Sequence, residues 1–596
     1  MTAEKEHLDY VECHPLEHDD QIDELTRRLE QVLTEERGFR DLNTEKQGKV
    51  KSILASMRKM RFDSRDMLET TASTLIEGLS SSLPRYISIS LDNASREIKK
   101  TRGVLVIYTG GTIGSAPKDL SDPDSPQIVK PWKDLKNASP QLGLLGYPVD
   151  AISFVEPLDS CNVGPRHWRT MARIIREKYD MYEGFVILHG TDSLVYTSSA
   201  LSFMLMGLNK PVVVTGSQIA GIVNARNDAH QNMITSIIVA NPKAHNLPPV
   251  NEVLIVFGNR ILRGVRGKKL NVIGFQGFDT PNYPRIGEAG EFVTLDRKLM
   301  RQWDGTDLQV FDQLDTNVIL LEIFPGIQNS PILKNILQDD NLSGVVLKAY
   351  GAGNIPTDAS FLKLFRDFIE EKGGVVIVVT SVPEGEVVMG LYETSQLLID
   401  RGLIGGFDLT PEAAMCKLMM LLGTYPERSQ RPLVRQLMQQ SLVGEQRLSL
   451  FTTSFVDAFE CRDGEFATIG RKELVSVEEA DRIEKVILRL KKTRLTTGED
   501  NTDVKVSLTV SIDDGTVLGT FQRGNIPQNA LVKDDNETGE SMVIDLSDYR
   551  DHFLAKSGSI KMKSARQIGF QISLKGNGKA SLSCEGMELN VYASEL

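Results

Sequence analysis

A short apolar run ends abruptly in two glycines and a threonine at residues 107–115, where the sequence reads Ile-Tyr-Thr-Gly-Gly-Thr-Ile-Gly-Ser. An apolar run that hardly alternates is typical of a strand buried on both faces of a parallel sheet. Glycine permits the sharp bend of a chain leaving such a strand, and α/β proteins bind ligands at the carboxyl ends of their strands. We therefore expect Thr112 to face a small ligand, with a purely structural turn as an equal alternative at this point.

A second strand end of the same composition occurs at residues 185–193, Phe-Val-Ile-Leu-His-Gly-Thr-Asp-Ser. It places Thr191 after its strand in the way that the first run places Thr112. The carboxyl ends of parallel strands lie at one edge of a sheet. Two strand ends that each deliver a threonine favour a functional site over a structural turn.

Strand-like runs and amphipathic segments alternate from residue 103 onward, which indicates an α/β fold with a mostly parallel sheet. The first lobe has strand-like runs at 104–108, 185–188, 212–215 and 253–257, and the second at 318–323, 345–347 and 375–379. Helices are predicted where apolar residues recur at helical spacing, as at Trp168, Met171, Ile174 and Ile175, and at 361–369 and 411–422. We expect a two-lobed core.

The expected domain organisation has five parts. Residues 1–100 form a charge-mixed helical extension, for which a partly disordered segment is an equal alternative. The two α/β lobes occupy residues 101–310 and 317–430. A helical connector at 431–500 leads to a small antiparallel β domain at 503–596, whose apolar residues alternate.

Bulk properties exclude several classes of partner. The chain has 596 residues and a net charge of −12, so it has no general attraction for nucleic acid or an anionic membrane surface. Its amino terminus is polar, and no apolar stretch is long enough to span a membrane. The five cysteines are scattered without metal-ligand spacing, which favours free thiols in a reducing compartment. We expect a cytoplasmic protein with no metal.

Five side chains near the predicted strand ends carry groups suited to amide hydrolysis: Thr112, Ser160, Thr191, Asp192 and Lys269. Splitting an amide through an acyl-enzyme requires an activated hydroxyl, a base within hydrogen-bond reach and donors for the developing oxyanion. The three hydroxyls, the acid and the amine, together with backbone N–H groups at the glycine turns, supply all three requirements.

Residues 103–422 resemble the bacterial-type L-asparaginases, and specifically their cytosolic type I branch. The resemblance rests on several motifs in the family's order: Tyr-Thr-Gly-Gly-Thr-Ile-Gly at 108–114, Leu-Asp-Ser at 158–160, His-Gly-Thr-Asp at 189–192, Val-Thr-Gly-Ser-Gln at 214–218, Arg-Gly at 263–264 with Lys269 beyond, Tyr-Gly-Ala-Gly-Asn at 350–354 and Gly-Gly-Phe-Asp-Leu-Thr-Pro-Glu-Ala at 405–413.

The resemblance implies hydrolysis of L-asparagine to L-aspartate and ammonia without a cofactor. Thr112 corresponds to the nucleophile that becomes acylated, and the residues of the proton relay are Thr191, Asp192 and Lys269. Asp159 and Ser160, with Cys161 beside them, correspond to the segment that holds the α-carboxylate and α-amino group of the substrate. Asp192 also holds the ammonium, which a charge-assisted hydrogen bond favours.

Each relay residue also has a structural interpretation. Lys269, in the run Arg-Gly-Lys-Lys, fits a solvated basic loop. Asp192 fits the N-cap of a helix at 193–207. His189 fits a packed, hydrogen-bonded side chain, and we assign it no chemistry.

Some positions depart from the family pattern. Ser193 stands where a threonine is usual, Cys161 replaces a serine, and Ala229-His230 replaces a glycine and its neighbour. The stretch at 115–131 lacks the tyrosine that many relatives place over the site. Because lids exclude water, we expect a working enzyme of modest efficiency unless another loop closes the site.

The function expected is that of an L-asparaginase, which the family's assemblies imply is a homodimer or homotetramer. An L-glutaminase activity remains open because one methylene is a small energetic difference. An amidotransferase-type amidase is disfavoured because that subunit carries its β domain before the amidase core. An interaction protein with an asparaginase-like core is disfavoured by the intact relay residues.

Overall fold

The computed structural model of the chain describes residues 102–119, 125–222, 224, 226–387, 389, 398 and 401–455, and strands within 86–89 and 459–594. The chain divides into two compact units, Met1–Asp312 and Gln313–Leu596. Within residues 1–100, only Tyr86–Ile89 is described, and it forms strand β1. The helical prediction is wrong for these four residues, because they pair with a neighbouring strand, and otherwise falls outside the described residues.

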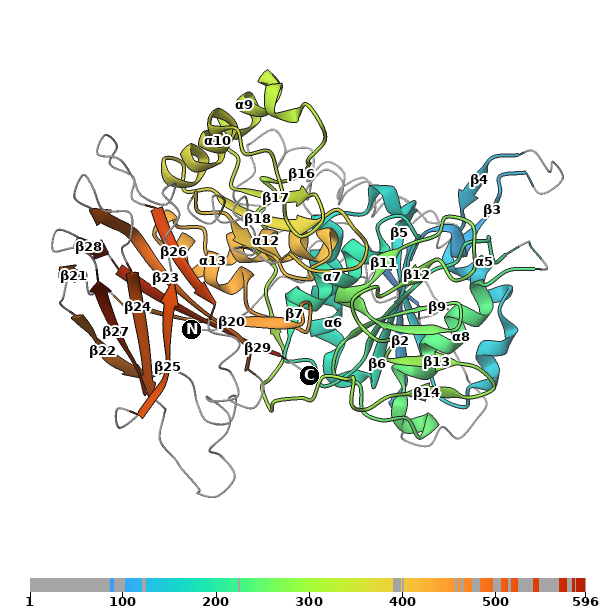
Figure 1. The fold of residues 1–596 in the computed structure, drawn as a ribbon. Coiled ribbons are helices and arrows are strands. Elements are labelled where there is room, and N and C mark those ends of the chain that lie inside the picture. The colour runs from blue at the N-terminus through green and yellow to red at the C-terminus, as the bar shows by residue number, and fades with distance from the viewer. Residues whose placement is uncertain are drawn as a thin grey trace, which may run out of the picture. The chain divides into compact units, whose positions relative to one another are not determined.

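The first unit is built on a nine-stranded sheet whose five central strands are parallel (Figure 1). In spatial order these are β5 (Val149–Leu158), β2 (Val104–Gly110), β6 (Gly184–Leu188), β8 (Val212–Thr215) and β9 (Val253–Phe257). The remaining strands are antiparallel: β1 at one edge and β10 (Arg260–Arg263), β13 (Gly287–Ala289) and β14 (Val293–Leu295) at the other. The four runs expected in this lobe are all strands.

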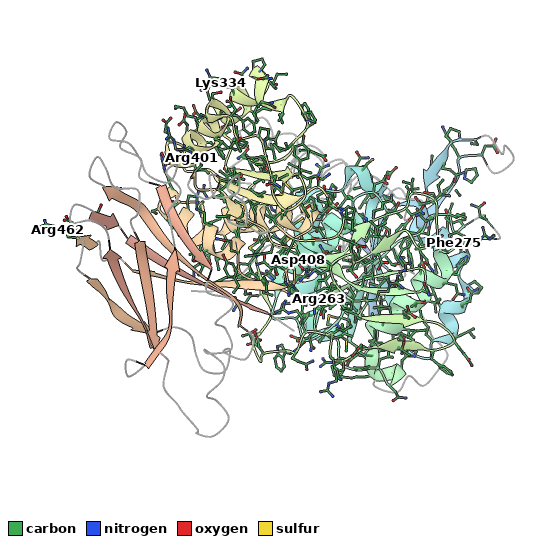
Figure 2. All side chains as sticks on the ribbon, in the orientation of Figure 1. Arg263, Phe275, Lys334, Arg401, Asp408 and Arg462 are labelled. Carbon is green, nitrogen blue, oxygen red and sulfur yellow. The ribbon has the colours of Figure 1, made fainter. Side chains whose placement is uncertain are left out.

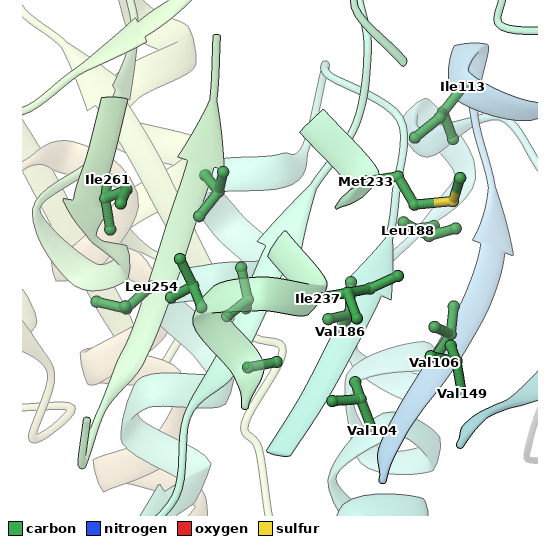
Figure 3. Packing of buried hydrophobic residues seen from close by; sticks show 14 of the residues in the cluster. Val104, Val106, Ile113, Val149, Val186, Leu188, Met233, Ile237, Leu254 and Ile261 are labelled. Atoms are coloured by element: carbon green, nitrogen blue, oxygen red, sulfur yellow. The ribbon is translucent and has the colours of Figure 1, made fainter. Parts of the chain in front are cut away.

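Both faces of the central strands are buried, as their unbroken apolar runs predict. Figure 3 shows one face, where Val104 and Val106 of β2 and Val186 and Leu188 of β6 pack with residues of helix α8 (Ala229–Ala240). Residues of the opposite face, such as Ile107 and Ile187, are equally inaccessible to solvent. Because neither face meets water, the strands have no polar alternation.

Two helices of this unit follow directly from the sequence pattern. Helix α6 (Pro165–Lys178) begins at a proline, which suits a first helical position, and buries the predicted Trp168, Met171, Ile174 and Ile175. Helix α7 (Leu194–Met204) packs against α6 and the central strands and is buried around nearly its whole circumference. The turn that carries Thr191 therefore lies between a buried strand and a buried helix.

The second unit begins with a four-stranded parallel sheet in the order β16 (Val318–Glu322), β17 (Gly344–Ala349), β18 (Val375–Thr380) and β19 (Ile404–Gly405). Its helices are α9 (Pro331–Leu337), α10 (Ala359–Glu370), α12 (Pro411–Thr424) and α13 (Arg431–Met438). Asp358 caps α10 and Thr410 caps α12 through their side-chain oxygens. The strands and helices predicted here agree with these elements.

Two antiparallel sheets follow in the same unit. One contains β20 (Leu448–Phe455), β21 (Phe459–Arg462), β23 (Ile483–Thr496), β26 (Glu540–Asp545), β28 (Ser581–Cys584) and β29 (Gly586–Ser594). The other contains β22 (Phe466–Glu473), β24 (Lys505–Ile512), β25 (Thr516–Arg523) and β27 (Gln567–Lys575). The β domain thus begins at Leu448, well before residue 503.

The helical connector predicted at 431–500 is wrong beyond α13. Strand β23 lies within this segment, in a part that the prediction assigned to a helix. Val486, Leu488 and Leu490 recur at every second residue in this strand, and β23 pairs along most of its length with β29. Pairing with strands far along the sequence overrides the local helical tendency of this segment. The sequence of the segment by itself does not reveal that pairing.

Candidate active site

The turn that ends β2 depends on the two glycines. Gly110 and Gly111 have φ values of +119° and +83°, which side chains other than hydrogen strongly disfavour. Gly111 donates its N–H to the carbonyl oxygen of Leu158 over 2.8 Å, and Thr112 then opens a short 3₁₀ helix, Thr112–Gly114. The sharp bend expected from the sequence is therefore present.

Three backbone segments meet at this turn. A Cβ atom on Gly111 would lie 2.2 Å from the nitrogen of Gly190, and one on Gly190 would lie 2.5 Å from Oγ of Ser160. The register of the sheet explains the proximity, because Tyr108 of β2 pairs with Leu188 of β6, the residue before the second turn. The segments that carry Thr112, Thr191 and Ser160 are thus in direct contact.

Replacing Gly111 with alanine is expected to destabilise the first unit by about 3 kcal/mol or more, because strained backbone and a backbone clash add together. The measurement is the urea midpoint followed by tryptophan fluorescence, since Trp132, Trp168 and Trp303 all lie in that unit. Gly143→Ala is the matched control, because no atom lies within 4 Å of a Cβ there. Equal midpoints for the two variants would contradict the described turn.

A hydrogen-bonded trio follows the second turn. Lys269 donates from Nζ to Oγ1 of Thr191 over 2.9 Å and to Oδ1 of Asp192 over 2.8 Å. Thr191 is 8% exposed, whereas the side chain of Lys269 is 20% exposed and that of Asp192 is 61% exposed. The amine therefore bridges a buried hydroxyl and a carboxylate that remains open to a ligand.

This geometry decides between the alternative interpretations of two residues. Lys269 is bonded to Thr191 and Asp192 and is not a freely solvated loop residue. Asp192 does not cap helix α7, because the N-cap position belongs to Ser193, which makes no capping hydrogen bond. Both side chains face the threonine turn.

Lys269 is delivered by a short strand, β11 (Lys268–Lys269), which pairs with β12 (Phe278–Asp279). The chain enters it from β10, where buried Arg263 forms an ion pair of 2.7 Å with Glu252. Figure 2 labels Arg263 and also Phe275, which lies in the loop that leaves β11. The strand pair and the buried ion pair define the path of the backbone on each side of the amine.

The segment Asp159–Ser160–Cys161 lies beside the same turn. Ser160 is 1% exposed, and its Oγ accepts a hydrogen bond of 3.1 Å from the N–H of Asp192. A second hydrogen bond joins the same segments, because Ser193 donates its hydroxyl to the carbonyl oxygen of Ser160. Asp159 and Cys161 are both exposed. Ser160 thus joins the two segments, while its two neighbours remain accessible from outside.

The stretch after Thr112 begins as a hairpin in which β3 (Ser115–Pro117) pairs with β4 (Gln127–Val129). The hairpin is attached at its base to strand β2, since Tyr108 donates its hydroxyl to the carbonyl oxygen of Lys130 over 2.7 Å. Tyr108 also packs beside Trp132. The expectation that the tyrosine-free hairpin lowers turnover stays a prediction.

Sequence reasoning missed a buried polar group that connects the site loops. The carboxylate of Asp228, 6% exposed, accepts from the backbone N–H of Gln218. The Gln218 side chain then donates to the carbonyl oxygens of Asn271 and Gly274, in the loop that follows Lys269. Gln218 is the last residue of the Val-Thr-Gly-Ser-Gln motif at 214–218, but only the folded chain shows which loop its amide contacts.

Two buried histidines lie near the site. Burial lowers the pKa of His189 to about 4. Burial, with smaller contributions from Arg166 and His189, lowers the pKa of His167 to about 4 as well. His189 is fully buried and bonded at both ring nitrogens, in agreement with its interpretation as a packed residue.

These pKa values predict acid sensitivity of the first unit. In the unfolded chain both histidines take up protons below about pH 6.5, whereas in the folded chain they stay neutral down to about pH 4. The unfolded state therefore binds more protons in this interval, and the free energy of unfolding falls as the pH falls, by roughly 1 kcal/mol per pH unit for each histidine near pH 5. Urea titrations between pH 7 and 5 measure the slope. His167→Gln should reduce it, and a slope unaltered by that change would contradict the assignment.

Among the described residues, no helix is long and apolar enough to cross a membrane. No group of three or more histidine, cysteine or acidic side chains is arranged to hold a metal ion in that part of the chain.

Two family models match the chain in succession. "Asparaginase, N-terminal" matches residues 103–301, and "Glutaminase/Asparaginase C-terminal domain" matches residues 317–434. The matched part contains all the candidate site residues.

Individual proteins agree with the family models. L-asparaginase 1 of Escherichia coli strain K12 is 36% identical over 347 residues, which cover 58% of this chain and 98% of that protein. The crystal structure of L-asparaginase I from Vibrio cholerae is 33% identical with a TM-score of 0.51, and covers 58% of this chain and 99% of that one. The thermostable L-asparaginase from Thermococcus kodakarensis is 30% identical with a TM-score of 0.50, with the same 58% and 99% coverage. The chain belongs to the asparaginase family.

Proposed function

We propose that this chain is an L-asparaginase, which hydrolyses L-asparagine to L-aspartate and ammonia through an acyl-enzyme on Thr112. The observation that carries the proposal is the Thr191–Lys269–Asp192 trio beside the turn that begins at Gly111. Family membership supports the substrate class.

In the proposed reaction, Oγ1 of Thr112 adds to the side-chain carboxamide carbon of asparagine. Its proton passes to the group formed by Thr191 and Lys269 and from there to the amide nitrogen, so that the C–N bond breaks and ammonia leaves. Backbone N–H groups at the glycine turns stabilise the oxyanion, which is the largest electrostatic requirement of such a step. Water then attacks the ester, its proton takes the same route back to Thr112, and aspartate is released.

The remaining residues hold the substrate. The exposed carboxylate of Asp192 suits the α-ammonium, because a charge-assisted hydrogen bond is stronger than a neutral one. The adjoining segment consists of Asp159, Ser160 and Cys161 and suits the α-amino and α-carboxylate end of the substrate. A thiol is a weaker donor than the usual hydroxyl, so Cys161→Ser is expected to strengthen substrate binding rather than weaken it.

The test is ammonia release by the purified full chain, with L-asparagine and L-glutamine measured in parallel. We expect kcat/KM to be higher for L-asparagine. The proposal would be overturned if the folded protein released no ammonia from either amide. A preference for L-glutamine would contradict the proposed substrate but not the proposed type of reaction.

The assembly and cellular location are part of the same proposal. We expect a homodimer or homotetramer, which light scattering on the purified chain measures directly, and a cytoplasmic protein that binds neither nucleic acid nor membrane. A monomer that remains fully active would contradict the expected assembly.

A further inference from the structure

A chain of buried hydrogen bonds leads from the interior to the turn before Thr191. Trp168 in α6 donates from Nε1 to Oγ1 of Thr197 in α7 over 2.9 Å. The same hydroxyl lies 3.0 Å from Nε2 of His189, and Nδ1 of His189 lies 2.7 Å from the carbonyl oxygen of Gly190. The proposed reaction assigns no step to any of these side chains.

The positions of the protons in this series of hydrogen bonds follow by elimination. The indole of Trp168 can only donate, so the hydroxyl oxygen of Thr197 accepts. The carbonyl of Gly190 can only accept, so Nδ1 of His189 carries the ring proton and donates it. Nε2 of the neutral ring is therefore unprotonated and accepts the one hydroxyl proton of Thr197. A single tautomer satisfies every group.

This arrangement fixes the peptide that joins Gly190 to Thr191. Its carbonyl oxygen points at the ring of His189, which is 0% exposed and therefore lies on the core side. The described peptide bonds are all trans, so the N–H of Thr191 points in the opposite direction, away from His189. The orientation of the turn that carries Thr191 thus depends on one imidazole N–H.

Packing alone does not require such a chain. Polar groups buried without partners are costly, and an apolar side chain fills the same volume without needing any. Here all three side chains are fully or nearly fully buried and each polar atom is paired. Burial also keeps the imidazole neutral at working pH, which the elimination requires, because it lowers the pKa of His189 to about 4.

We propose that His189 is a positioning residue for the hydrolysis, which holds the Gly190–Thr191 peptide in the orientation that places Thr191 against Lys269. The inference rests on the proposed function. It adds that the geometry of the proton relay is set from the core, through the hydrogen bond by which Thr197 anchors His189 at Nε2.

Thr197→Val tests the inference with little change of shape. Valine removes the hydroxyl that donates to Nε2, so the ring loses the contact that anchors it at Nε2, while Nδ1 still faces the carbonyl of Gly190. We expect kcat to fall about tenfold with KM within about twofold, because one hydrogen bond that orients the relay is lost. Thr197→Ser keeps the donor and should restore kcat. In ¹⁵N-histidine spectra, the Nδ1–H form of His189 should dominate in the wild type, and in the valine variant the Nε2 signal should shift toward that of a nitrogen without a hydrogen bond.

The control for general destabilisation is His167→Gln. His167 is another buried histidine of this unit, but its Nδ1 accepts from the N–H of Gly164 at the start of α6. We expect it to lower the melting temperature without lowering kcat of the folded protein. Wild-type kcat in Thr197→Val, or equal losses in the valine and serine variants, would overturn the positioning role. Absence of ammonia release by the wild-type chain would instead overturn the proposed function.

Discussion

Thr112→Ala is expected to lower kcat for L-asparagine by roughly ten-thousandfold, because it removes the atom that forms the acyl-enzyme. Thr112 opens the 3₁₀ turn and is only partly buried, so its loss should leave the fold intact. The measurement is steady-state ammonia release, together with the melting temperature of each variant.

Two controls separate chemistry from structure in this experiment. Thr112→Ser keeps the hydroxyl and should retain most of the activity. Thr109→Val removes a buried hydroxyl from strand β2, which leads to Thr112; this hydroxyl donates to the carbonyl oxygen of Leu188, and its loss should reduce stability more than kcat. Retention of a tenth or more of wild-type kcat by Thr112→Ala would show that another group is the nucleophile.

Lys269→Met has the second largest expected effect, a loss of about a thousandfold in kcat. Methionine has a similar length and no amine, so Thr191 loses its 2.9 Å partner and Asp192 loses its countercharge. General acid–base groups contribute factors of this size. The KM for L-asparagine should change less than kcat, because Asp192 still presents a carboxylate to the substrate ammonium.

Lys268→Met is the matched control for this loss. Lys268 is the neighbour of Lys269 on the same two-residue strand, and successive side chains of a strand point to opposite faces. It should retain nearly full kcat. Equal losses at the two positions would mean that the amine acts through the general charge of the strand and not through Thr191.

The α/β part of the fold was predictable because its signals are local. Strands buried on both faces read as unbroken apolar runs, and helix α6 shows its buried face in the spacing from Trp168 to Ile175. The strand β23 was not predictable in the same way. Its partner β29 lies about a hundred residues later, so the pairing that stabilises it is absent from the segment itself.

The candidate site was predictable as a set of residues but not as a network. The motifs named Thr191, Asp192 and Lys269, and the structure brings these three together. The supporting contacts escaped prediction because they join side chains to backbone atoms of distant loops, as Gln218 joins the loop after Lys269. The sequence position of Asp192 also allowed a role as a helix cap. In the structure the N-cap position belongs to Ser193, and the carboxylate of Asp192 accepts from Lys269.

The most direct test of the account is the site of acylation during turnover. The full chain is mixed with saturating L-asparagine, quenched in acid within milliseconds and at later times, digested and analysed by mass spectrometry. We predict an aspartyl group on the peptide that contains residues 108–114, localised to Thr112 and absent from Thr112→Ala. An aspartyl group on Thr191, or ammonia release with no adduct at any quench time, would contradict the account.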